Sequence, residues 1–254
     1  MQAIDFHTHT HPTAETGVAF QQRWGLAEPA RNGTVPELFG IMDRAGVSRT
    51  LIVPWMPAQD IVDEILAERS GGAPSHADRE RAERAVVERW IALNQWAVDA
   101  VAEHPDRLMC LVGLDPVLMD ANTLRREAAD KLAQGAIGLK IAPMFLRVPA
   151  NDEAMNVFYE AAREHGVFVL SQAGAGGWMG APAWGHPEHF EDVLRSFPEV
   201  DIQLAHLGIG AEEEVVRLTG RYPNLYADCS TRLHLFGQPG QWSLDEADGG
   251  GGDR

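Results

Sequence analysis

Short apolar runs alternate with stretches of helical pattern along almost the whole sequence. Helix-end signals such as Gly46 and Gly135 separate the two kinds of segment. Alternation at this spacing is typical of βαβ units, which build a parallel sheet. We expect strands at 2–9, 48–55, 107–115, 136–143, 167–173, 201–207 and 224–229, and helices at 35–46, 79–104, 119–134, 151–165, 187–197 and 211–221.

Two architectures contain such a sheet. A doubly wound sheet needs a glycine-rich phosphate turn after its first strand, but residues 7–12 read His-Thr-His-Thr-His-Pro. The length of 254 residues is close to the ~250 of a (β/α)8 barrel. We therefore predict an α/β fold, a TIM (β/α)8-type barrel in which seven βα units are visible and the eighth strand is missing.

The predicted barrel domain covers residues 1–230, and residues 231–254 form a polar tail that is too rich in glycine for a barrel strand. Residues 10–34 and 56–78 are long connections with little periodicity. They follow the first two strands, so they belong to the face where barrel enzymes hold their active sites. An open barrel exposes its edge strands, which makes a homodimer a candidate assembly.

The composition excludes several classes of partner. The net charge of −16 disfavours binding to nucleic acids or anionic membranes. No apolar run approaches the ~20 residues of a membrane span, and no export leader precedes the first strand. Cys110 and Cys229 lie in separate apolar segments and form no metal-type pair. A cytoplasmic protein with a small-molecule substrate is expected.

The first strand carries the most informative motif, Asp5-Phe-His7-Thr-His9. Alternate residues of a strand share one face, so His7 and His9 point the same way and their imidazoles can bind one divalent ion. Asp5 lies on the same face, where it can hold a ring N–H from behind. We expect this strand to be short and buried. The alternative is a histidine-rich strand end at the surface.

His206 ends the apolar strand at 201–207 and is a candidate third ligand. A lone histidine in such a run is more often a core residue, but the pair at another strand end favours a metal site. Three imidazoles with an open position form the typical site of zinc hydrolases, where the ion activates a water molecule. The predicted cofactor is a divalent metal, zinc first.

Four further residues are candidates for the site. Lys140 is either a partner for a substrate carboxylate, a carbamylated ligand, or a lysine that reaches the barrel mouth without a role. Gln172 is a weak metal ligand or a residue that orients a loop. His186 faces substrate or only starts a helix, and Asp228 is a base, a ligand or a capping residue.

The ordered motifs resemble a known family. They are the Asp5-x-His7-x-His9 run, Lys140-Ile-Ala-Pro143, His186-Pro187 and Ala205-His-Leu-Gly208. Together they resemble the amidohydrolase-related metal-dependent hydrolases, especially the branch with aminocarboxymuconate semialdehyde decarboxylase and related aromatic-acid decarboxylases. The resemblance covers residues 1–230 and implies a TIM barrel that usually holds zinc, with the family's histidines at His7, His9 and His206.

The sequence departs from that family at two positions. Gln172 stands where the family commonly has a fifth-strand histidine, and the chain ends before the eighth-strand aspartate that handles protons. The resemblance implies hydrolysis of a C–N or C–O bond in a small carboxylate or cyclic substrate. The alternatives are decarboxylation of an unsaturated or aromatic acid, and an inactive barrel that binds a small molecule or itself.

Overall fold

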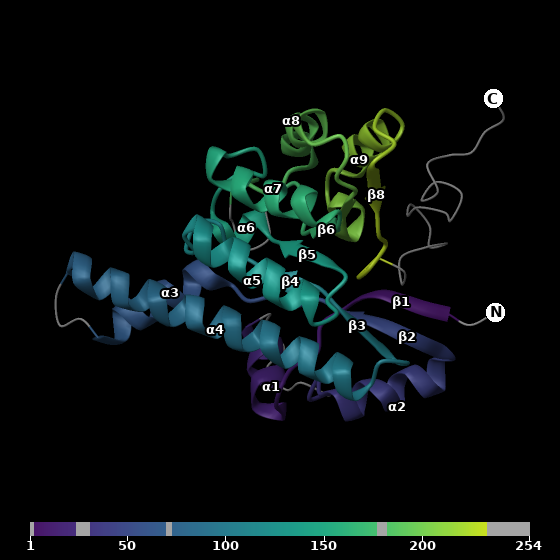
Figure 1. The fold of residues 1–254 in the computed structure, drawn as a ribbon, viewed down its shortest axis with the longest axis horizontal. Coiled ribbons are helices and arrows are strands. Elements are labelled where there is room, and N and C mark those ends of the chain that lie inside the picture. The colour runs from purple at the N-terminus through teal and green to yellow at the C-terminus, as the bar shows by residue number, and fades with distance from the viewer. Residues whose placement is uncertain (1–2, 24–30, 70–72, 177–181, 233–254) are drawn as a thin grey trace.

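Parallel strands form the centre of the protein and helices cover them on the outside (Figure 1). The computed structural model describes residues 3–23, 31–69, 73–176 and 182–232. The strands are β1 (Ala3–Thr8), β2 (Val47–Ile52), β3 (Leu108–Cys110), β4 (Val112–Gly113), β5 (Gly138–Ile141), β6 (Phe168–Ser171), β7 (Ile202–Leu204) and β8 (Leu225–Ala227).

The strands follow one another in sequence order. β1, β2 and β3 form one parallel ladder, and β4 to β8 form another. β3 and β4 are two parts of one predicted strand, 107–115, that is interrupted at Leu111. The N–H of Leu111 still donates to Ile52 O at 3.1 Å, so the ladder continues across the interruption. The eight labelled strands therefore fill the seven predicted positions.

Consecutive parallel strands with helices outside give the chain the TIM-barrel type of fold, as the sequence predicted. Within the described residues β8 does not pair with β1, although a side-chain contact between His7 and Asp228 joins the two strands at one end. The predicted tail covers residues 231–254, and the prediction that no eighth strand follows concerns the same residues. All but the first two of these residues lie outside the described part.

Most predicted helices are present within a few residues. The helices are α1 (Ala14–Arg23), α2 (Val35–Ala45), α3 (Ala58–Arg69), α4 (His76–Glu103), α5 (Ala121–Ala133), α6 (Pro143–Leu146), α7 (Asn156–His165), α8 (Phe190–Ser196) and α9 (Glu212–Thr219), with 3-10 turns η1 (Glu153–Met155), η3 (Pro187–His189) and η4 (Ala205–Gly208). No described helix has the length and apolar character that crossing a membrane requires.

The connections 10–34 and 56–78 are more ordered than predicted, because α1 and α3 lie within them. α1 starts with a reciprocal cap that Thr13 and Thr16 form. The N–H of Thr16 donates to the Thr13 hydroxyl at 3.3 Å, and the N–H of Thr13 donates to the Thr16 hydroxyl at 3.2 Å. Both helices have weak apolar periodicity, which explains why the pattern did not reveal them.

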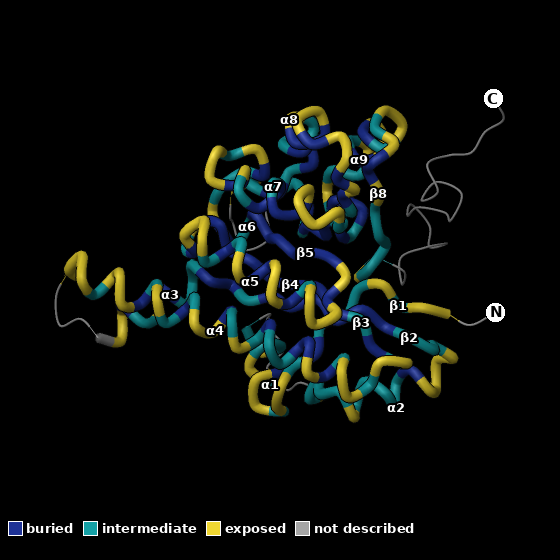
Figure 2. The backbone as a smooth tube through the Cα atoms, in the orientation of Figure 1, coloured by how far each residue is buried: buried dark blue, intermediate teal, exposed yellow. Residues whose placement is uncertain are grey.

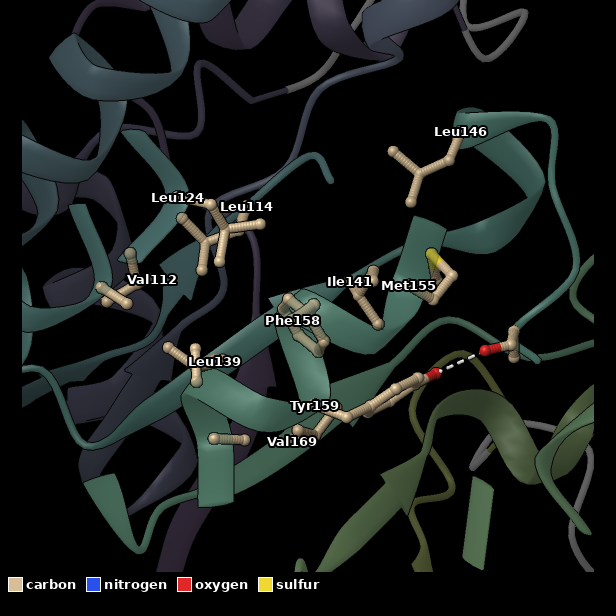
Figure 3. Packing of buried hydrophobic residues seen from close by; sticks show 14 of the residues in the cluster. Val112, Leu114, Leu124, Leu139, Ile141, Leu146, Met155, Phe158, Tyr159 and Val169 are labelled. Atoms are coloured by element: carbon tan, nitrogen blue, oxygen red, sulfur yellow. Dashed lines mark hydrogen bonds between the residues drawn. The ribbon is translucent and has the colours of Figure 1, made fainter. Parts of the chain in front are cut away.

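The main hydrophobic core lies between the strands and the helices. Phe158 and Tyr159 of α7 face Leu139, Ile141 and Val169 of β5 and β6 (Figure 3), and all five side chains are buried. A smaller apolar cluster lies on the inner face of the sheet. Its side chains come from the strands and from residues that directly follow them: Leu51, Val53, Leu111, Leu170 and Ala205. Strands buried on both faces need apolar residues throughout, as β5 has except at Lys140.

β1 differs from the buried strand that we predicted. Ile4 is 56% exposed and Phe6 is 39% exposed, and the start of the strand lies at the surface (Figure 2). The reason is its place at the edge of the sheet, where it pairs only with β2 in the described structure. Burial increases toward the end of the strand, where the histidines lie.

Candidate metal centre

β1 brings His7 and His9 to one side at its carboxyl end. Their ring centroids lie 5.3 Å apart, with the rings nearly perpendicular. The carboxylate of Asp5 accepts the backbone N–H of His7 at 3.1 Å, so it fixes the main chain of the strand. Asp5 was predicted to hold a histidine ring N–H, but the carboxylate that contacts the ring of His7 in this structure is Asp228.

His206 joins the pair from the other end of the chain. It follows β7 in η4, where His206 and Leu207 both have positive φ angles, 63° and 53°. This left-handed turn directs the imidazole toward β1. The ring stacks on that of His7 with centroids 5.1 Å apart and planes 26° apart. The structure thus brings together the three histidines that the sequence singled out.

Each of the three rings uses Nδ1 to contact the protein. His7 Nδ1 lies 2.9 Å from Asp228 Oδ2, and His9 Nδ1 lies 2.9 Å from Val53 O. His206 Nδ1 lies 3.2 Å from Ser230 O. Because carboxylate and carbonyl oxygens only accept, these contacts favour the neutral tautomer with the proton on Nδ1 and the lone pair on Nε2.

A divalent ion fits these residues. His7 Nε2 is buried and has no hydrogen-bond partner within the described part of the chain, as expected of a nitrogen that awaits a ligand. Within the described residues, one nitrogen each from His7 and His206 lies within 4.8 Å of the other and of an oxygen of Asp228, a group that does not include His9. Imidazole nitrogens held from behind by oxygen acceptors are typical of protein metal centres.

Electrostatics favour the neutral form of His9 and His206. Burial and the neighbouring His7 lower the pKa of His206 to about 4, and the same two causes hold the pKa of His9 well below its usual value. Burial alone would raise the pKa of Asp228, but hydrogen bonds from His7 and Ser230 keep it below the ordinary range. Neutral imidazoles beside an ionised carboxylate suit a cation.

Lys140 provides a cation of the chain's own. It lies on β5 with 3% of its surface exposed. Burial lowers its pKa to about 7, and the charge of Asp228 partly opposes this shift. Its charge in turn contributes to the low pKa values of His9 and His206, which indicates that it lies near these two rings. Lys140 therefore belongs to this site.

An aromatic surface adjoins His9. The ring of Phe20 lies 5.7 Å from that of His9, and the ring of Trp55 lies 6.2 Å from it. Phe20 and Trp55 meet edge to face at 5.3 Å, and Phe145 meets Trp55 in the same way at 4.5 Å. Trp55 is buried, whereas Phe20 and Phe145 are half-buried. These three residues form the aromatic wall.

Salt bridges to α3 fasten the two segments that carry the outer rings of this wall. Arg23 of α1 pairs with Glu64 at 2.7 Å. Arg147, directly after α6, pairs with Asp60 at 2.7 Å and with Asp63 at 2.8 Å. α3 thereby connects the segment that carries Phe20 to the segment that carries Phe145. These salt bridges hold both outer rings of the aromatic wall in place.

Two predicted residues do not join the histidines. Gln172 follows β6, and its buried Oε1 finds no partner in the described structure. It lies against Gly185, where an added Cβ would come within 2.7 Å of that oxygen. His186 caps η3 by accepting the N–H of Glu188 at 3.2 Å, and it lines a separate surface pocket with Arg217.

Sequence reasoning missed Gln203 and Ser230. Gln203 Nε2 donates to Asp228 Oδ2 at 2.8 Å, and Ser230 contacts both His206 and Asp228. The run Asp228-Cys-Ser230 did carry a signal, since a serine two residues after an aspartate is typical of a side-chain-capped turn. The aromatic wall was missed because its rings come from three distant segments.

Solved structures of low sequence identity share this fold. An uncharacterized TIM-barrel protein from Bordetella bronchiseptica has 18% identity and a TM-score of 0.67, over 92% of this chain and 76% of that one. The 2,6-dihydroxybenzoate decarboxylase from Rhizobium has 14% identity and a TM-score of 0.61, over 94% and 81%. The manganese-bound 5-carboxyvanillate decarboxylase from Novosphingobium aromaticivorans has 15% identity and a TM-score of 0.59, over 89% and 74%.

The sequence itself carries the family assignment. No protein of curated function matches it significantly. Residues 4–248, by contrast, match the amidohydrolase family profile, which confirms the family that the ordered motifs predicted. The chain is therefore a member of the amidohydrolase family.

Proposed function

We propose that this chain catalyses the metal-dependent decarboxylation of a small carboxylic acid that carries a flat, unsaturated ring. One observation carries the proposal: a buried amine, Lys140, and an aromatic wall both lie near His9. The protonated amine suits the carboxylate of such an acid, and the aromatic wall suits its ring. Similar solved structures include two enzymes named as decarboxylases of aromatic acids.

His7, His9 and His206 would hold the metal ion, with zinc as the proposed species. Family membership supports a divalent cation, and one similar structure contains manganese. Imidazole nitrogens accept either ion. Bound there, the ion would polarise an oxygen of the substrate and draw negative charge from the reacting bond.

Lys140 would bind the substrate carboxylate in a site that excludes water. Loss of carbon dioxide breaks the bond between the carboxyl carbon and the ring, and the electron pair of that bond stays on the ring. The protonated amine of Lys140 would then return one proton to the ring carbon. Its pKa of about 7 suits a group that gives up a proton near neutral pH.

Hydrolysis is the second candidate, because three imidazoles around one cation also suit water activation. This reaction needs a base for the attacking water. Among the described residues, Asp228 is the carboxylate that contacts the ring of His7, and donors already occupy both of its oxygens. Its pKa is also held below the ordinary range. These two facts favour decarboxylation over hydrolysis.

Product analysis tests the proposal. Protein loaded with zinc or manganese is incubated with 2,6-dihydroxybenzoate or 5-carboxyvanillate as probes, and with simple esters and lactones. We expect carbon dioxide and the decarboxylated ring from at least one aromatic acid. Ester or lactone cleavage without gas release would favour hydrolysis. Neither reaction, in protein that retains its metal, would contradict both candidates and favour a barrel that only binds.

Matched variants show which residues act. His7→Ala combined with His9→Ala should remove the bound metal, as measured by mass spectrometry. Lys140→Met should abolish turnover and leave the metal content unchanged. The control is Lys131→Met, because Lys131 is equally buried, at 3% exposure, but lies on α5 and contacts Gln95. Equal loss of turnover in both lysine variants would contradict the role of Lys140.

A further inference from the structure

The carboxylate of Asp228 accepts so many hydrogen bonds that no lone pair remains for it to act as a catalytic base. Its Oδ2 accepts from His7 Nδ1 at 2.9 Å and from Gln203 Nε2 at 2.8 Å. Its Oδ1 accepts the backbone N–H of His206 at 3.1 Å, the backbone N–H of Ser230 at 3.0 Å, and the Ser230 hydroxyl. A carboxylate has about four lone-pair positions. These five donors fill them.

We propose that Asp228 is a positioning residue that builds the metal centre before any ion binds. It sets the tautomer of the His7 ring and holds the backbone that aims His206. This inference rests on the metal centre of the proposed function, but it concerns the protein without substrate. It therefore stands or falls separately from the reaction that the enzyme performs.

The tautomer of His7 follows from the acceptor behind it. A carboxylate cannot donate, so the proton of the neutral ring stays on Nδ1 and faces Asp228. The lone pair then lies on Nε2, the buried atom without a partner in the described structure. Metal ions bind only the nitrogen that carries the lone pair. Asp228 thus leaves Nε2 ready for the ion.

The backbone of His206 depends on the same residue. His206 and Leu207 have left-handed φ angles of 63° and 53°, a backbone conformation that is strained for residues other than glycine. The carboxylate of Asp228 accepts the N–H of His206, and its carbonyl oxygen accepts the N–H of Leu207 at 2.7 Å. Asp228 therefore stabilises the strained turn that directs His206 toward His7.

Asp228→Asn is the discriminating variant because it removes one acceptor without changing the shape. The backbone N–H groups of His206 and Ser230 require the amide oxygen on their side. The amide NH2 must then face His7 Nδ1, which can only accept from it. The ring proton moves to Nε2, which must lose that proton before it can bind an ion.

Two measurements read out this change. Metal titration against a chromophoric chelator should show the affinity for zinc or manganese falling by about 10- to 100-fold, the usual effect of losing such a partner. Nitrogen-15 NMR of the metal-free protein should show the His7 proton on Nδ1 in the parent chain and on Nε2 in the variant. A residue that only stabilised the fold would not move this proton.

Asp5→Asn is the matched control. Asp5 is a carboxylate on the same strand, and it accepts the backbone N–H of His7 rather than a ring proton. The amide oxygen can still accept that bond, so metal affinity and tautomer should stay unchanged. The inference is overturned if Asp228→Asn binds metal as tightly as the parent. It is also overturned if the parent chain carries the His7 proton on Nε2, which requires no variant to fold.

Discussion

Asp115 and Asp228 are carboxylates just beyond the ends of parallel strands, one facing the helix layer and the other facing the histidines. Asp115 is 0% exposed, and burial raises its pKa to about 6. The side chain of Asp228 is only 14% exposed, yet its pKa is held below the ordinary range. Burial is therefore not what separates the two carboxylates.

The difference lies in the number of donors. Asp115 Oδ1 accepts the backbone N–H groups of Val117 and Leu118, both at 3.0 Å; within the described residues Oδ2 makes no hydrogen bond of good geometry, although the indole of Trp90 is close enough to lower the pKa slightly. Asp228 has donors on both oxygens, including the ring of His7. At Asp228, hydrogen bonds and the Coulomb interaction with His7 outweigh desolvation, whereas at Asp115 desolvation outweighs the hydrogen bonds. The ionised form of Asp228 is therefore stabilised in the site, whereas burial disfavours the ionised form of Asp115 in the core.

Removing each carboxylate should give the largest contrast. Asp228→Ala leaves five donors without their acceptor and should lower the free energy of unfolding by about 3–4 kcal/mol. Asp115→Ala leaves two backbone donors but also removes a costly buried carboxyl, so about 1–2 kcal/mol is expected. Urea unfolding at neutral pH with a chelator present measures both. Equal losses would show that donor number does not distinguish the two groups.

The pH dependence of stability should reveal Asp115 by itself. Its pKa is about 6 when folded and ~3.9 when unfolded, so the folded chain binds the proton more tightly. Stability from this group is present below pH 4, falls as the pH rises toward 6, and stays lower above it. The expected fall is about 3 kcal/mol over the whole range, at ~1.4 kcal/mol for each pKa unit.

The control for that fall is Asp115→Asn, which cannot ionise. Urea unfolding of the parent and the variant at pH 4.5 and pH 7.5 isolates this one group from the other carboxylates. The difference in stability between the two proteins should change with pH in favour of the variant as the pH rises. A constant difference would mean that Asp115 ionises normally and that its Oδ2 reaches water.

The smallest expected effect comes from one donor of Asp228. Ser230→Ala removes the hydroxyl that contacts Asp228 and lies 2.8 Å from His206 Nδ1, but keeps the backbone N–H donor. A loss of about 1 kcal/mol in unfolding free energy is expected, with metal affinity reduced by less than in Asp228→Asn. A larger loss of affinity than in Asp228→Asn would make Ser230 the main organiser.

The sequence predicted the strands and the histidine cluster because both depend on simple periodicities. Alternation on β1 placed His7 and His9 on one side, and parallel strands in sequence order brought His206 to the same end. Two features were not predicted. The strand at 107–115 is interrupted at Leu111, and helices α1 and α3 occupy segments whose apolar periodicity is weak.

The sequence could not predict which acceptor stands behind which ring. Asp5 is two residues from His7, yet the ring contact goes to Asp228, which lies 221 positions away. Such pairings depend on where β8 ends relative to β1, and that is a tertiary property. The same holds for His186, whose Nδ1 is taken by a local helix cap.

The left-handed turn at His206 and Leu207 has a consequence for protein engineering. A histidine placed at a strand end of another barrel would follow ordinary right-handed backbone and point its ring elsewhere. Transplanting this centre therefore requires two pieces together, the turn Ala205–Gly208 and the segment 228–230 that binds it. Transplanting the three histidines alone would omit the segment that holds the turn in its conformation.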